Sequence, residues 1–73
     1  MKQFKTAFEY SDNLWIAGCD ELRITLEERS FDALVVRMKE AIQEIAETEL
    51  EYKGDIQLVI SVHDRIEEIK AVG

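Results

Sequence analysis

Apolar and polar residues alternate near the start of the chain, which is the pattern of a β-strand with one buried face. The side chains on the more apolar side of this first segment are Phe4, Thr6, Phe8 and Tyr10. Ser11, Asp12 and Asn13 follow and favour a turn, because their short polar side chains bond to nearby backbone groups. The pattern therefore predicts a first strand that ends at this turn.

Two further strands are predicted before residue 30. The run Leu14–Ala17 is apolar on both sides, which is typical of a strand with both faces covered. After a turn at residues 18–21, Leu22, Ile24 and Leu26 alternate with polar residues and predict a third strand. Because the connections are short, we expect the three strands to form an antiparallel meander.

A long amphipathic helix is predicted from Phe31 to about Tyr52. Its apolar residues recur at spacings of three and four, as expected for a helix with one buried side. They are Phe31, Leu34, Val35, Met38, Ala41, Ile42 and Ile45. Ser30 is the expected N-cap, and Gly54 is expected to adopt the left-handed conformation that terminates helices.

The clearest alternation lies after the helix and predicts a fourth strand. Its apolar positions on one side are Ile56, Leu58, Ile60 and Val62. Further on, Ile66, Ile69 and Val72 keep the spacing of a short helical turn, whereas residues 65–67 are also compatible with a longer strand. Both interpretations of this segment stay open.

The predicted order of elements is βββαβ, and it indicates an α+β fold. We expect a two-layer sandwich, with one long helix on a four-stranded mixed sheet of order 3-2-1-4, and a single domain over residues 1–73. One helix covers only one face of such a sheet. Since Leu14, Trp15 and Ile16 alternate between faces, they cannot all pack against it. An apolar region on the open face would suit a homodimer formed through that face.

The charge of the chain adds a second kind of surface. The 73 residues carry a formal net charge of −7, which favours solubility and, as a sharper hypothesis, a basic partner. It argues against direct binding to nucleic acid or to an anionic membrane, because phosphates are neutralised by Lys and Arg. The expected docking residues are spaced four, three and four apart on one helix side, namely Glu40, Glu44, Glu47 and Glu51. A solvated helix face is the simpler interpretation of the same spacing.

The sequence gives little support for catalysis or for a cofactor. His63 is the only histidine and Cys19 the only cysteine, so we expect neither a metal site nor an internal disulfide. We interpret His63 as an exposed residue near a strand end; an enzyme that uses it with a carboxylate is the weaker hypothesis. One cysteine, no signal peptide and no membrane span favour a reduced, cytoplasmic setting.

Three short segments resemble a known family. They are Asp12–Ala17, the helix start Ser30–Leu34, and Lys39–Ile42. Together they resemble the N-terminal domain of HicB antitoxins, and more closely a sibling HicB-like family of short bacterial proteins without assigned function. The resemblance extends from Phe4 to about Arg65.

The resemblance implies a degraded ribonuclease-H-like fold without catalytic carboxylates, and a role in neutralising a small basic HicA-type toxin that binds mRNA. HicB proteins usually carry a C-terminal DNA-binding segment, and only a short segment follows the fourth strand here, so we expect no DNA binding. We therefore predict a protein-binding domain that uses Trp15 for apolar contact and the glutamates for electrostatic docking. The alternative is a stand-alone, self-associating structural module.

Overall fold

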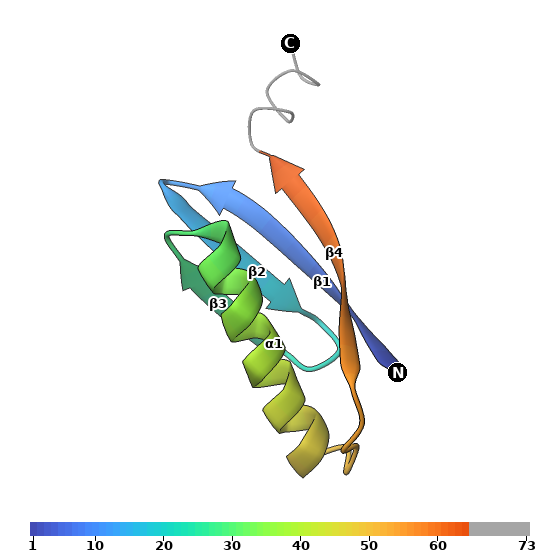
Figure 1. Cartoon of the computed structure of the whole chain (residues 1–73). Coiled ribbons are helices and arrows are strands. Elements are labelled where there is room, and N and C mark those ends of the chain that lie inside the picture. Colours follow the sequence, from blue (N-terminus) through green and yellow to red (C-terminus); the bar gives the residue numbers. More distant parts are fainter. Residues whose placement is uncertain (65–73) are drawn as a thin grey trace.

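The structure is a computed structural model that describes residues 1–64 (Figure 1). It contains three strands, a helix and a fourth strand, which confirms the predicted order βββαβ. The elements are β1 (Lys2–Ser11), β2 (Leu14–Cys19), β3 (Ile24–Glu28), α1 (Phe31–Thr48) and β4 (Ile56–Asp64). The two interpretations of the segment after residue 64 fall outside the described residues.

The strands form one mixed sheet of order β3-β2-β1-β4, as the sequence predicts. β1 pairs antiparallel with β2, and β2 pairs antiparallel with β3. β4 returns along α1 and pairs in parallel with β1 over its whole length, from Lys2↔Ile56 to Tyr10↔Asp64. The sheet therefore has two edges, β3 and β4, at opposite sides of the molecule.

Both antiparallel connections contain residues with positive φ. Asp12 and Asn13 have φ values of 54° and 65°, and they alone separate the paired residues Ser11 and Leu14. Positive φ at both central residues is the geometry of the tight hairpin turn that Asn and Asp favour. The second connection lies later than predicted, because β2 continues to Cys19 and β3 begins only at Ile24.

The helix begins where the sequence predicts but ends earlier. The Ala33 amide donates to Ser30 Oγ at 3.2 Å, so Ser30 is the N-cap. The predicted end at Tyr52 is wrong, because α1 ends at Thr48 and Glu51 takes a left-handed conformation with φ of 55°. This reversal lets the Tyr52 amide donate to a carbonyl of the last helical turn. Gly54, the predicted terminator, has no positive φ.

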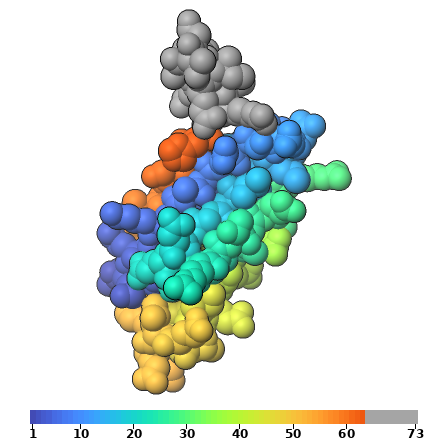
Figure 2. All heavy atoms as spheres, turned by 180° about the vertical axis from the view of Figure 1, so that it is seen from behind, coloured from blue at the N-terminus to red at the C-terminus, as the bar shows by residue number. Residues whose placement is uncertain are grey.

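The core lies between α1 and one face of the sheet (Figure 1). Its buried apolar residues are Phe4, Phe8, Ala17, Cys19, Leu34, Met38, Ile42, Ala46 and Ile56. Thr6 is the buried polar residue among those described, and its hydroxyl donates to the carbonyl of Val59 at 3.2 Å. Seen from behind, the opposite face is formed by atoms of β1, β2 and β3, with no helix across it (Figure 2).

The second strand divides its apolar residues between the two faces. Trp15 pairs with Tyr10 on the helix side of the sheet, where its ring lies 5.0 Å from that of Phe31. Leu14 and Ile16 point to the open face and are half-buried there. The prediction that these three residues cannot share one face is therefore confirmed.

Candidate functional site

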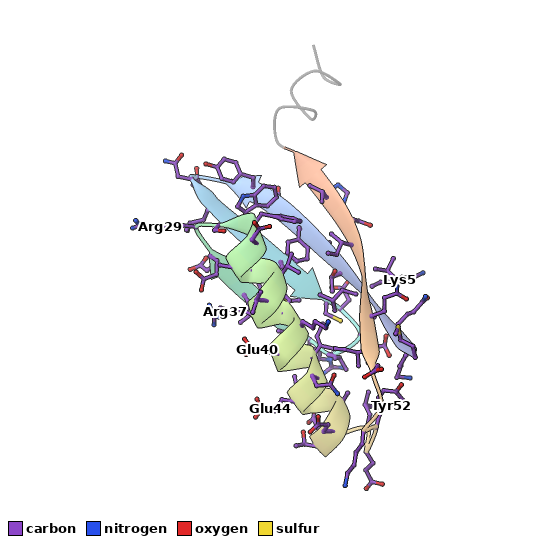
Figure 3. All side chains as sticks on the ribbon, viewed as in Figure 1. Lys5, Arg29, Arg37, Glu40, Glu44 and Tyr52 are labelled. Carbon is purple, nitrogen blue, oxygen red and sulfur yellow. The ribbon has the colours of Figure 1, made fainter. Side chains whose placement is uncertain are left out.

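The outward side of α1 carries three of the four glutamates predicted to bind a partner. Glu40, Glu44 and Glu47 are exposed, and their spacing of four and three places them on one side of the helix. Figure 3 shows Glu40 and Glu44 projecting from the same side of α1, away from β4. Glu51 does not belong to this group, because the helix ends before it and the chain reverses there.

A shallow hollow of about 510 Å³ runs along this side of the helix. Its lining consists of Val36, Lys39, Glu40, Gln43, Glu44 and Glu47, and we call this set the acidic helix face. The apolar member is Val36, whose side chain is 57% exposed. An exposed valine beside several carboxylates combines an apolar contact with a charged rim, which is the usual anatomy of a protein interface. The sequence pattern does not distinguish Val36, because this residue lies outside the predicted buried stripe.

The negative charge of the acidic helix face is only partly balanced. Lys39 lies within the face, but Glu40, Glu44 and Glu47 form no ion pair with any of residues 1–64. The last turn of α1 contains no basic residue, although the partial negative charge of a helix C-terminus favours one. Arg37 is already paired with Glu28 at 2.6 Å. The face thus retains negative potential at a fixed position on a well-packed helix.

Trp15 lies away from the acidic helix face, although both were predicted to contact the partner. Its ring packs against Phe31 at 5.0 Å and Tyr10 at 5.3 Å, at the N-terminal end of α1. Glu47 lies sixteen residues after Phe31, which is about 24 Å along the axis at 1.5 Å per residue. Trp15 therefore supports the fold, as an aromatic cluster with its neighbours, and one small partner would have to span the helix to contact both places.

A second hollow, of about 690 Å³, lies on the open face of the sheet. Lys5, Asp20, Ser61 and His63 are among the residues that line it. His63 pairs in register with Glu9 on this face, whereas Cys19 is buried on the helix side. The sheet thus separates the histidine from the cysteine. No group of three or more metal-ligating residues occurs within residues 1–64.

The exposed apolar side chains gather on β4 rather than on the middle of the open face. Val59, Ile60 and Val62 are 40%, 37% and 49% exposed. Ile60 and Val62 point to the helix side, since they pair in register with Thr6 and Phe8. Their alternation predicts burial, but the end of β4 that carries them extends away from α1 and is left uncovered (Figure 1). The exposure of these side chains depends on where the helix lies and does not follow from their alternation.

No protein-family model, curated protein or solved structure matches this chain. The resemblance to HicB antitoxins accordingly rests on the sequence segments alone. Among residues 1–64, no helix has both the length and the apolar character needed to cross a membrane.

Proposed function

We propose that this chain is a cytoplasmic protein-binding domain of the HicB antitoxin type, and that its acidic helix face docks a small basic protein. The observation that carries the proposal is the set of exposed glutamates beside Val36, at fixed spacing on α1 and without cationic partners among residues 1–64. A basic partner supplies the missing cations.

The structure of α1 supports such docking because the helix is held in place before a partner arrives. Leu34, Met38 and Ile42 are fully buried against the sheet, and Ser30 caps the first turn. The glutamate backbone positions are therefore fixed, and little further ordering is required on binding. Opposite charges on the two proteins would accelerate their encounter and select against acidic competitors.

The resemblance to HicB antitoxins suggests what such binding would achieve. A HicA-type toxin binds mRNA through a basic surface, and an acidic protein of this size can compete with the phosphates for the same cations. The mixed sheet with one helix is consistent with the fold that the resemblance implies. Neutralisation would then occur by occlusion of the partner, without catalysis by this chain.

The proposal is tested by titrating the chain with any small basic protein that a gene next to its own encodes. The binding variant replaces Glu40, Glu44 and Glu47 by glutamine, and a matched control replaces Glu9, Glu21 and Glu27, which are also exposed. Both variants remove three negative charges, but only the first changes the acidic helix face.

We expect calorimetry at low salt to show at least about tenfold weaker binding for the first variant, since three rim charges contribute roughly 0.5 kcal/mol each. The control should bind within about twofold of the unaltered chain. High salt should reduce the difference between them. Absence of any complex at low salt, or equal weakening by both variants, would refute the proposed docking surface.

A further inference from the structure

The outer edge of β4 offers backbone hydrogen-bonding groups without a neighbouring strand. β4 pairs with β1 on one side, and no other strand within residues 1–64 lies on its other side. At nine residues it is longer than most strands, and it is regular throughout its pairing with β1. An edge of this kind accepts another extended chain through main-chain hydrogen bonds.

The composition of residues 56–62 in β4 does not protect this edge. Residues 56–62 contain no charged residue, no proline and no glycine. Natural proteins block exposed edges with charged residues, with proline, with bulges or with covering elements, because an open edge otherwise pairs with another chain. Val59, Ile60 and Val62 are also exposed, so apolar surface flanks the open edge on both faces of the sheet.

We propose that β4 pairs antiparallel with β4 of a second copy of this chain. The pair would join the two sheets into one continuous sheet, with the two β4 strands at its centre. This surface differs from the open sheet face that the sequence suggested, and from the acidic helix face of the proposed function.

The lack of charge on residues 56–62 indicates that β4 pairs with a second copy of this chain rather than with the basic protein. Residues 56–62 offer no acidic side chain to a cationic strand. A neutral, largely apolar edge is complemented by a neutral, largely apolar strand, and residues 56–62 of a second copy meet that description. Because residues 56–62 carry no charge, two copies meet along this stretch without like charges opposite each other, despite the net charge of −7.

The side-chain pattern of β4 is also complementary to itself. With a two-fold axis at Ile60, this residue faces its own copy, and Leu58 faces Val62 of the second copy. On the other side of the sheet, Val59 faces Ser61. In an antiparallel pair, opposite side chains point to the same face, so the apolar positions of both copies come together. A two-fold pair of this type closes on itself and does not propagate into a fibre.

The position of α1 leaves space for the second copy. The helix lies over β2 and β3 and contacts β4, while the C-terminal half of β4 extends away from it (Figure 1). The two-fold axis would be perpendicular to the sheet, and both helices would lie on the same face with the paired β4 strands between them. The acidic helix faces would remain accessible in the dimer.

The test compares the solution mass of the full chain with that of two edge variants. Light scattering after size exclusion should give twice the protomer mass of 8.5 kDa at about 0.5 mM, and dissociation on dilution. Ile60→Lys and Val62→Lys should each yield the protomer mass, because both place like charges near the two-fold axis. Thr25→Lys is the matched control, at an exposed position on the other edge strand, β3, and it should remain dimeric. Circular dichroism confirms that each variant is folded.

Hydrogen exchange locates the contact in the unaltered chain. The outward amides of β4 should become protected as the concentration rises, whereas those of β3 should not change. A protomer mass at every concentration would overturn the proposal, and β4 amides protected at low concentration would then indicate that the chain covers its own edge. A dimer that survives both β4 substitutions, or that is lost with Thr25→Lys, would equally refute pairing at β4. Loss of binding to the basic protein has no bearing on this result, since the variants leave α1 unchanged.

Discussion

The two edge strands of the sheet, β3 and β4, differ in how far their outer edges are protected. β3 has five residues, includes Glu27 and Glu28, and is followed at once by the turn into α1. Arg37 of the helix reaches over it, donating to the Glu28 carboxylate at 2.6 Å and to the Glu27 carbonyl at 3.4 Å. β4 has nine residues, and its stretch from 56 to 62 is uncharged.

This difference follows from the path of the chain. The helix starts directly after β3 and must pack beside it, so β3 acquires a cover and an ion pair. It then crosses to the opposite end of the sheet, and the chain returns as β4 at the far side of β1. One helix is too narrow to cover four strands, and the last strand is left partly open. An edge near the helix is protected by the fold, whereas a distant edge depends on its own sequence or on a partner.

The largest expected effect concerns Phe8 and Val62, which are register partners on the same face of neighbouring strands. Phe8 is fully buried and packs on Phe31, while Val62 is 49% exposed. We expect Phe8→Ala to lower the free energy of unfolding by about 3–5 kcal/mol and Val62→Ala by about 0.5 kcal/mol.

Urea denaturation at about 1 µM protein, where self-association contributes little, measures both losses. Phe8→Leu retains most of the apolar volume and replaces the alanine variant in this test if that variant no longer folds. We expect it to lower the free energy of unfolding by about 1 kcal/mol. Similar losses for Phe8→Ala and Val62→Ala would mean that α1 covers the two positions alike, and would contradict the exposure of this part of β4.

A smaller effect is expected where α1 begins, beside the protected edge. The Ser30 hydroxyl accepts a hydrogen bond from the Ala33 amide at 3.2 Å, so Ser30→Ala should cost about 1 kcal/mol of stability. Ser61→Ala on the exposed part of β4 is the control and should stay within about 0.5 kcal/mol of the unaltered chain. Thermal unfolding followed by circular dichroism at 222 nm reports both. An unchanged melting temperature for Ser30→Ala would show that the cap does not hold the helix at this edge.

The smallest effect is that of the ion pair across the β3 edge. Arg37 and Glu28 have side chains 48% and 32% exposed, so solvent screens their attraction. Arg37→Met keeps the apolar stem and should cost about 0.5 kcal/mol at low salt and less at high salt. Arg29→Met is the control, because Arg29 is exposed and forms no ion pair within the described part of the chain. A loss that does not depend on salt would assign the effect to packing of the stem rather than to charge.

Most of the fold could be predicted from the sequence because its signals are local. Alternation between Phe4 and Tyr10 sets the faces of β1, the turn residues after it allow a hairpin, and Ser30 caps the helix that follows. Short connections and one long crossover then leave few possible sheet orders. The strand order observed is the one expected from these constraints.

The candidate site was predicted less completely, because the positions of two residues predicted for it depend on where elements end and pack. Glu51 continues the helical spacing of the other glutamates, yet the chain has already left the helix at that point. Trp15 is apolar and aromatic wherever it lies, and only the structure places it against Phe31, away from the acidic helix face. The exposure of Val36 depends on the orientation of α1, which the sequence pattern did not reveal at this position.

The sequence by itself determined the kinds of elements, their order and, for β1, β3 and β4, the side that faces the helix. Those properties arise from backbone preferences and from a two- or three-to-four-residue periodicity, and both act over a few positions. The tertiary structure alone decided which edge is covered. Ile60 and Val62 have the same alternation as the buried positions, but burial depends on what lies opposite a side chain. That is fixed by the path of α1, far away in the sequence.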